Sequence, residues 1–412
     1  MKRIVVTGIG MVTPVGNDVR TSWENLKAGK NGVDIIKGFD VTDYPSKIGA
    51  EVKDFTLDGF HPKNLRRMDK FVQFALKASI EAFQDSGLTL SDKEKERTGV
   101  IIGAGIGGLR VIEEQNAVLL ASGPSRVSPF LIPMLIPDMA AGQVAIHFGL
   151  KGLNFATVSA CASGAHALGV ALNLLKNGVT DIVIAGGTES CITPLGLAGF
   201  CSLRALSVRN DAPNKASRPF DRERDGFIMG EGAGIVVLET LEHAVSRKAP
   251  KIYAEFIGSG MSCDAHHITA PDPEGKGASL SMKYALENAG MAREDVDYIN
   301  AHGTSTPLND KSETAAIKRL FGESAYEIPI SSNKSMIGHL LGASGSVEFI
   351  STALTIKEGI VPPTINYEFP DPECDLNYVP NQAIEKNIDV AISNSFGFGG
   401  HNITLVLKKF TG

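Results

Sequence analysis

The sequence lacks any apolar run that approaches the ~18 residues needed to span a membrane. It also lacks a block of Lys and Arg of the kind that follows nucleic-acid phosphates, and its formal net charge is −6. Its five cysteines include no Cys-x-x-Cys pair, which indicates reduced thiols rather than a disulfide framework. We therefore expect a soluble, cytoplasmic protein with no nucleic-acid partner and no membrane span.

Signals for metals and cofactors are also scarce. His266 and His267 are adjacent, and no Cys/His cluster has the spacing of metal ligands, so no metal site is expected. The run 103–108 has the G-x-G-x-x-G spacing of a dinucleotide-binding turn, but no acidic residue follows it about twenty positions later. We therefore expect no nicotinamide or flavin cofactor.

The apolar pattern of the chain is typical of an α/β fold. Short apolar runs alternate with helical patterns, which predicts a buried, largely parallel sheet covered by helices. The predicted strands are 3–7, 99–103, 181–185, 234–239, 252–258, 298–301, 327–331, 390–393 and 403–408. The predicted helices are 70–86, 162–177, 278–289, 311–321 and 346–357.

A faint internal repeat suggests two related halves. Residues 162–178 align without gaps on 343–359, and 8–11 align on 258–261. Two matches in the same order favour a duplicated βα unit, although coincidence is the alternative in a chain rich in Gly and Ala. We predict an N-terminal half, 1–250, and a C-terminal half, 251–412. The first half carries two long insertions, 34–67 and 204–230, which we expect to cap a site or form a subunit contact.

Cys161 is the first candidate for chemistry. It lies between Ala160 and Ala162, after a predicted β-like stretch, 154–160, and before a predicted helix. A thiol at a strand-to-helix turn meets the positive end of the helix dipole, which favours the thiolate and predicts a nucleophile. Packing is the alternative for a small cysteine among alanines. The other cysteines have no such setting and are interpreted as structural: Cys191, Cys201, Cys263 and Cys374.

Two histidines occupy glycine-rich turns in the second half. His302 follows a predicted strand, and His339 follows Gly338, five residues after Lys334. The carboxyl ends of strands are where α/β folds place their sites. A lone histidine is more often structural, but two of them with a nucleophile in the other half predict acyl transfer. Neutral imidazole N–H groups would then hold a developing enolate.

The run 394–402 follows the strand predicted at 390–393 and has three glycines around Phe398. Such a backbone can approach a ligand closely and move. A tight hairpin into the final strand is the other interpretation, and both can hold.

Together these motifs resemble the β-ketoacyl-acyl-carrier-protein synthases, the condensing enzymes of type II fatty-acid synthesis, and look most similar to their elongating group, synthase II. The resemblance covers essentially the whole chain and is carried by 160–167, 302–304, Asn333 with Lys334, and Gly338 with His339. It implies a duplicated thiolase-like α/β sandwich with layers in the order α-β-α-β-α. It also implies a homodimer without cofactors, whose substrates are carried on the phosphopantetheine arm of acyl carrier protein.

The resemblance implies a decarboxylative Claisen condensation of malonyl-acyl carrier protein. Cys161 would hold the acyl chain as a thioester, and the N–H groups of Cys161 and Phe398 would form the oxyanion hole. His302 and His339 would support decarboxylation and hold the enolate, and the product would be two carbons longer. Lys334 would organise the histidines, paired with Glu348, because an unpaired buried lysine is costly.

The resemblance also implies residues that bind the substrates. Thr269, Thr304 and Thr306 would contact the malonyl unit or the pantetheine arm. Ile106 would lie along the acyl tunnel and help to set chain length, and Phe398 would gate the second substrate.

Acyl carrier protein is acidic, so a basic patch is expected at the tunnel mouth. The positions that match the family's docking residues are Lys63, Arg66, Arg67 and Arg204. For each of them, an ordinary solvated surface is the alternative.

Four other functions are alternatives to this one. A degradative thiolase acting on coenzyme A would need a second catalytic cysteine near the C-terminus, where this chain has 399–401. A non-catalytic partner subunit would lack the nucleophile. An initiating synthase III would use Cys-His-Asn rather than two histidine motifs. A polyketide ketosynthase shares mechanism and motifs, and only its substrate range would separate it.

Overall fold

The computed structural model describes all 412 residues. Ten strands form one sheet in the order β10-β9-β13-β14-β8-β1-β7-β6-β4-β5. Their bounds are β1 Ile4–Val12, β4 Gly99–Gly103, β5 Asn154–Phe155, β6 Ile182–Glu189, β7 Gly232–Thr240, β8 Glu255–Cys263, β9 Tyr298–Asn300, β10 Ile330–Ser331, β13 Val390–Gly397 and β14 His401–Lys408. Two small ribbons pair β2 Asp34–Ile35 with β3 Ile48–Gly49 and β11 Ile360–Val361 with β12 Ile384–Glu385.

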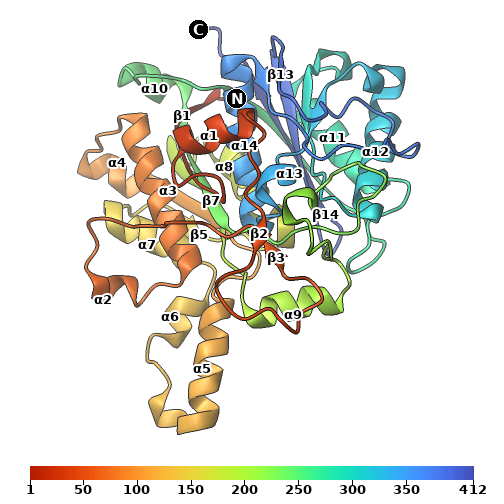
Figure 1. The fold of residues 1–412 in the computed structure, drawn as a ribbon. Helices are drawn as coiled ribbons and strands as arrows, with labels where there is room; N and C mark the ends of the chain where they lie inside the picture. Colours follow the sequence, from red (N-terminus) through yellow and green to blue (C-terminus); the bar gives the residue numbers. More distant parts are fainter.

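Fourteen helices accompany these strands (Figure 1). Those of the first half are α1 Val19–Lys27, α2 Pro62–Leu65, α3 Lys70–Ser86, α4 Asp92–Arg97, α5 Leu109–Ser122, α6 Leu131–Leu135, α7 Met139–Phe148, α8 Ser163–Lys176, α9 Pro194–Ser202 and α10 Leu241–Ser246. Those of the second half are α11 Lys276–Ala289, α12 Pro307–Phe321, α13 Lys334–Ile337 and α14 Ser344–Glu358.

The sheet is built from two copies of one strand order. From the middle outwards, the first half runs β1-β7-β6-β4-β5 and the second runs β8-β14-β13-β9-β10. The halves meet where β1 lies beside β8, with hydrogen bonds from the N–H of Val6 to the Ala254 carbonyl (3.0 Å) and from the N–H of Tyr253 to the Val6 carbonyl (2.9 Å). The aligned segments 162–178 and 343–359 form α8 and α14, which pack against each other between the two half-sheets. With α3 and α7 outside one half-sheet and α11 and α12 outside the other, the layers are α-β-α-β-α.

Glycines at matching positions explain why the first strand of each half has the same short sequence motif. A Cβ at Gly10 of β1 would lie 1.9 Å from the Ala78 carbonyl oxygen of α3, and one at Gly260 of β8 would lie 2.2 Å from the Ala285 nitrogen of α11. Glycine therefore lets each outer helix lie directly on its strand.

The expectation of a largely parallel sheet is wrong. Parallel pairing joins β4 to β5 and β6, and β9 to β10 and β13, whereas the central strands β1, β7, β8 and β14 pair antiparallel with their neighbours. Helices cover both faces of these central strands, so β1 and β7 are buried throughout and show the same continuous apolar runs as parallel strands.

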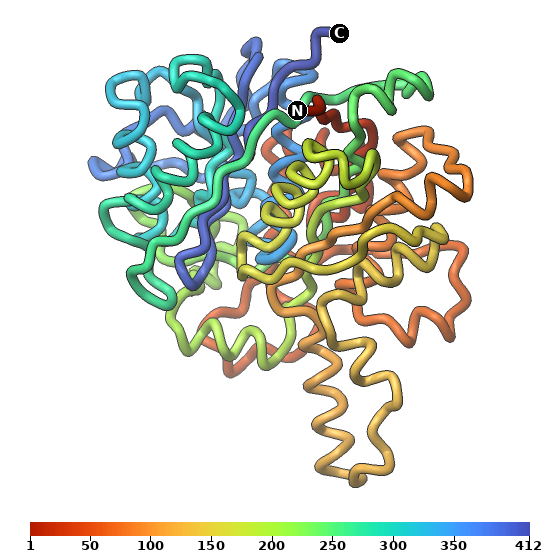
Figure 2. The backbone as a smooth tube through the Cα atoms, turned by 180° about the vertical axis from the view of Figure 1, so that it is seen from behind, coloured from red at the N-terminus to blue at the C-terminus, as the bar shows by residue number.

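The largest element without a sequence prediction is the hairpin of α5 and α6, which projects from the body of the molecule (Figures 1 and 2). Its apolar side chains are largely exposed, including Leu120 at 79% and Ile132 at 59%. The predicted helix 70–86 has the bounds of α3, which begins after the Asp69 cap and ends at Gly87 in the left-handed conformation.

Candidate active site

One cavity of about 470 Å³ gathers most of the predicted site residues. Those that line it are Ile106, Cys161, Arg204, Thr269, His302, Thr304, Thr306, His339 and Phe398. Lys334 and Glu348 are buried behind His302 and do not line the cavity. Lys63, Arg66 and Arg67 are exposed on and just after α2, outside the cavity lining.

Cys161 lies in a strained turn. The strand predicted to reach residue 160 ends at Phe155, and Ala160 to Ala162 form a 3₁₀ turn in which Ala160 has a φ of 50°. Ser163 holds this turn closed, because its Oγ donates to the Ala160 carbonyl (2.7 Å) and accepts from the Ser159 N–H (2.9 Å). The sulfur is therefore fixed directly before α8 rather than at the end of a strand.

The thiol of Cys161 is neutral at rest. Burial raises its pKa to about 11, although the Lys334 charge and the N–H groups of Phe398 and Cys161 lower it. The sequence expectation of a lowered pKa is thus wrong for the free protein, because the dry surroundings outweigh the helix terminus. The same N–H groups, however, are the two donors expected of an oxyanion hole.

His302 and His339 lie close together and are both neutral. Their ring centroids are 5.3 Å apart with the planes at 85°, and burial together with the Lys334 charge lowers both pKa values well below the usual range. The Leu341 N–H donates to Nδ1 of His339 (3.3 Å), and the Lys334 ammonium lies 3.4 Å from Nδ1 of His302. Both partners can only donate, so each ring carries its proton on Nε2.

Lys334 connects the turn of His302 to Glu348. Its ammonium donates to the His302 carbonyl (2.6 Å) and forms a buried ion pair with Glu348 of α14. Burial raises the pKa of Glu348 to about 7, against the lowering effect of Lys334. The family resemblance predicted the pairing of Lys334 with Glu348, and the structure contains this contact.

The loop that carries Phe398 is the tip of the hairpin between β13 and β14, so the hairpin interpretation is correct. The tip is tied to the neighbouring loop, because the Gly399 N–H donates to the Ile268 carbonyl (2.8 Å) and the Asp264 N–H to the Gly400 carbonyl (2.9 Å). A Cβ at Gly397 would lie 2.8 Å from the Ser159 carbonyl oxygen, so this glycine lets the hairpin touch the turn that holds Cys161.

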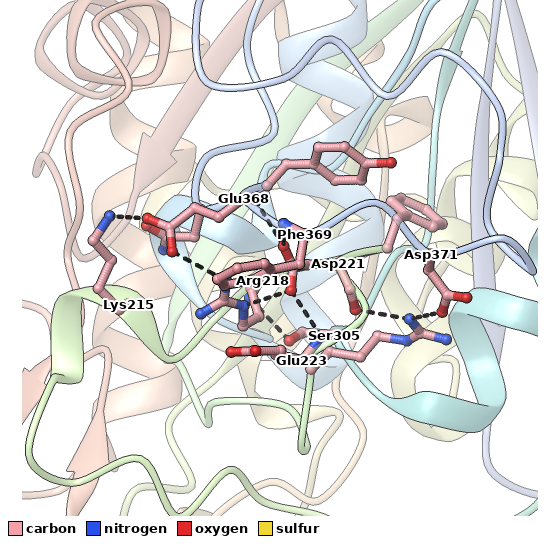
Figure 3. Close-up of polar contacts among 12 residues, drawn as sticks. Lys215, Arg218, Asp221, Glu223, Ser305, Glu368, Phe369 and Asp371 are labelled. Atoms are coloured by element: carbon pink, nitrogen blue, oxygen red, sulfur yellow. Dashed lines mark hydrogen bonds and ion pairs between the residues drawn. The ribbon is translucent and has the colours of Figure 1, made fainter.

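A buried charge network supports the turn that bears Thr304 and Thr306 (Figure 3). Ser305 has a φ of 69° and its Oγ accepts from the Arg218 N–H (2.9 Å). Arg224 donates to the Thr306 carbonyl (3.2 Å) and pairs with Asp371 (2.6 Å). Within the insertion 204–230, the residues that line the cavity are Arg204, Ala205, Asp225, Gly226 and Phe227.

Sequence reasoning missed two supporting carboxylates, Glu189 and Glu313. Glu313 of α12 accepts from the N–H groups of His302 and Gly303 (2.8 Å each) and thereby fixes the histidine turn. Burial raises the pKa of Glu313 to about 7. Nothing in a single sequence separates such an acid from a surface one, because its partners are two backbone N–H groups and the side chain of Asn394, 81 positions away.

The predicted docking residues lie on two segments of the chain, one at α2 and one after α9. Arg204, with a φ of 53° after α9, lies at the cavity, while the guanidinium of Arg67 stacks 4.4 Å from the ring centroid of Phe130 before α6. Figure 1 shows α2 and α9 on either side of the α5–α6 hairpin. No group of three His, Cys, Asp or Glu side chains is placed to hold a metal, and no helix combines the length and apolarity that crossing a bilayer requires.

Comparison with known families agrees with this geometry. The β-ketoacyl synthase N-terminal domain matches residues 1–244, and the β-ketoacyl synthase C-terminal domain matches residues 253–368. The chain therefore belongs to the β-ketoacyl synthase family, with its thiolase-like α/β fold, and is an acyltransferase.

Relatives within the family are similar over their whole length. A 3-oxoacyl-[acyl-carrier-protein] synthase 2 from Synechocystis is 55% identical over 99% of this chain and 98% of the relative. Proteins of the same description from Coxiella burnetii and Staphylococcus aureus are each 52% identical over 99% of both chains. Among solved structures, a β-ketoacyl synthase from Burkholderia phymatum (35% identity) and a type II polyketide ketosynthase in complex with its acyl carrier protein (36% identity) each cover both chains completely with a TM-score of 0.93.

Proposed function

We propose that the chain elongates acyl chains by decarboxylative condensation, with both substrates delivered as thioesters of acyl carrier protein. The observation that carries this proposal is the single cavity in which Cys161, two oxyanion donors and two neutral histidines converge. The relatives' descriptions as 3-oxoacyl-[acyl-carrier-protein] synthases support the same substrates.

In the first step, the Cys161 sulfur attacks the acyl thioester carbonyl as its proton is lost. The carbonyl oxygen becomes an oxyanion that accepts from the N–H groups of Cys161 and Phe398, each contact being worth roughly 3 kcal/mol. When the tetrahedral intermediate collapses, the carrier thiol leaves with a proton and the acyl chain stays on Cys161. Thr304 and Thr306, whose hydroxyl oxygens lie 2.9 Å apart at the cavity wall, offer hydroxyl groups to the pantetheine arm.

In the second step, malonyl-carrier thioester loses carbon dioxide. The C–C bond electrons form an enolate, whose oxygen accepts from the Nε2–H groups of His302 and His339. Neutral imidazoles suit this task because their N–H groups are very weak acids, which donate hydrogen bonds to the enolate without protonating it. The enolate carbon then attacks the Cys161 thioester, Cys161 leaves as a thiolate, and the 3-oxoacyl product is two carbons longer. Lys334 holds His302 in place and supplies a positive field throughout.

Intact-mass and product analysis tests this function. Purified protein is mixed with C12- or C16-acyl carrier protein, and malonyl carrier protein follows. We expect an acyl adduct on Cys161 that is absent from Cys161→Ala, followed by a 3-oxoacyl carrier protein two carbons longer. An absent adduct, or activity only with coenzyme A thioesters, would contradict the proposal. Products that carry several successive keto groups would instead favour a polyketide ketosynthase, which the 36%-identical solved structure keeps as the second candidate.

We also propose that carrier protein docks through Lys63, Arg66, Arg67 and Arg204, in a cytoplasmic homodimer. Arg66→Glu with Arg67→Glu should weaken binding of acyl carrier protein about tenfold or more, since like charges that face each other at the rim of an interface repel and slow association. Fluorescence anisotropy of labelled carrier protein measures this. The control is Lys93→Glu, which reverses an exposed charge on α4. Equal affinity in the double variant and the control would remove the assignment.

A further inference from the structure

The glycine-rich turn after β4 already holds an anion that belongs to the protein itself. Three successive N–H groups converge on the carboxylate of Glu189 at the end of β6: Gly105 (2.7 Å to Oε2), Ile106 (3.2 Å to Oε2) and Gly107 (3.0 Å to Oε1). Successive N–H groups of this kind form anion-binding nests, as in phosphate sites. The G-x-G-x-x-G run thus has the local form of a phosphate cradle, but an internal carboxylate fills it.

The same carboxylate holds a second turn. The Gly342 N–H donates to Oε2 of Glu189 (3.1 Å), and Gly342 follows His339 by three residues. Glu189 is fully buried and forms no ion pair. Burial raises the pKa of its carboxyl, while the backbone N–H donors of the two turns lower it, and the Cys191 thiol donates to it as well (3.5 Å). A buried carboxylate without such donors would be strongly destabilising.

Both turns reach the cavity. Ile106 belongs to the first, and Leu341, next to Gly342, belongs to the second, and both line the cavity. A Cβ at Gly342 would lie 2.4 Å from the Gly105 nitrogen and 2.7 Å from Oε2 of Glu189, so the two turns are in direct contact around the carboxylate. A displacement of either turn would therefore also move the other.

We propose that Glu189 is a positioning residue that fastens the tunnel wall at Ile106 to the turn following His339, so that chain-length selection and condensation share one buried carboxylate. The inference rests on the proposed function, which gives Ile106 and His339 their roles. Glu189 contacts neither substrate in this scheme. It acts through the two turns, and its charge also raises the pKa of Cys161 whichever acyl chain is delivered.

The test compares rate constants for two chain lengths. In Glu189→Gln the amide keeps the shape of the side chain but turns an NH₂ group towards donors. We expect the ratio of acylation rate constants, kcat/KM for C16- over C10-acyl carrier protein, to shift by about threefold or more. A merely structural role would lower Tm and the active fraction, but the active fraction cancels in this ratio.

Two further variants complete the design. Glu239→Gln is the control, since Glu239 is equally buried but lies on the neighbouring strand β7 opposite Ile182, at the far end of β6 from Glu189, where it binds Thr7, His243 and Arg247. It should lower Tm and leave the ratio unchanged. Glu189→Asp keeps the charge on a shorter side chain that cannot reach both turns. It should also shift the ratio, and it decides the matter if Glu189→Gln does not fold.

The outcomes separate the two proposals. A wild-type ratio in the folded Glu189 variants would overturn the positioning role. Failure of the wild-type protein to be acylated by either chain would instead overturn the proposed function, and with it the roles assumed for Ile106 and His339.

Discussion

Three side chains at the cavity hold protonation states that their surroundings impose. Burial raises the pKa of Cys161 to about 11 and lowers the pKa values of His302 and His339 well below the usual range. All three are therefore uncharged near pH 7, and Lys334, paired with Glu348, contributes the cation beside them. The free protein consequently keeps Cys161 as a thiol, and only a small fraction of the molecules carries the reactive thiolate at any moment.

The raised pKa of Cys161 predicts a steep pH dependence. Between pH 7 and 9, alkylation of Cys161 by iodoacetamide should rise about tenfold per pH unit, because the thiolate fraction grows with pH everywhere below the pKa. In Lys334→Met the rate should be lower at each pH, since the charge that lowers the pKa is gone. The peptide containing Cys161 is followed by mass spectrometry, because Cys263 is exposed and also reacts. A rate that levels off below pH 8 would contradict the raised pKa.

Ile106 predicts a change in specificity. Ile106→Gly removes a side chain from the cavity wall and should move the product profile towards longer chains, since the tunnel gains volume. The lengths of the 3-oxoacyl products are read by mass spectrometry. Ile384→Gly on β12 is the control, because Ile384 is exposed to the same 37% and lies outside the cavity lining. Identical profiles for wild type and Ile106→Gly would end this role.

At the scale of the elements, the closeness of helix and strand depends on missing side chains. The Gly10→Ala variant of β1 should destabilise the fold by about 3 kcal/mol, because its Cβ would lie 1.9 Å from the Ala78 carbonyl oxygen and force α3 away. Urea denaturation measures the free energy of unfolding. In the control Gly199→Ala, on the exposed face of α9, the new Cβ meets nothing within 4 Å, so stability should stay within about 1 kcal/mol. Equal stabilities of the two variants would refute the contact argument.

The elements also show what the sequence could and could not predict. Helices such as α3 were predicted because their caps and periodicity are local, and the turns of Cys161 and His302 were predicted because small residues and glycines mark them. Strand direction was not, since burial on both faces gives parallel and antiparallel strands the same apolar run. Glu189 and Glu313 were missed because most of their partners are backbone N–H groups, which leave no mark in the sequence.

At the scale of the whole molecule, an open sheet edge and an exposed hairpin stay uncovered. The edge strand β5 exposes Asn154 and Phe155, Val158 beyond it is 62% exposed, and the α5–α6 hairpin, which projects from the body in Figure 2, exposes Leu120 and Ile132. An open sheet edge and exposed large apolar side chains are features that proteins normally cover. They make this side the surface we assign to the proposed homodimer.

The assignment predicts the effect of one charge. Leu120→Asp should convert a dimer to monomers, because an unpaired carboxylate in an apolar interface is costly to bury. Light scattering after size exclusion measures the mass. The control is Val245→Asp, which alters another exposed apolar residue, 61% exposed, on α10 at the far end of the molecule (Figure 1). A dimer that survives Leu120→Asp, or a wild-type monomer, would contradict the interface.

The strand order of the sheet also affects how the chain folds during synthesis on the ribosome. β1 leaves the ribosome first. Its neighbour β7 is completed only at Thr240, which pairs with Ile4, and its other neighbour β8 begins only at Glu255. Through most of the synthesis of the first half, an apolar strand therefore waits with both edges open. Such long-range pairing slows folding and exposes the chain to aggregation. We therefore expect this chain to depend most on a chaperone while its first half is being synthesised.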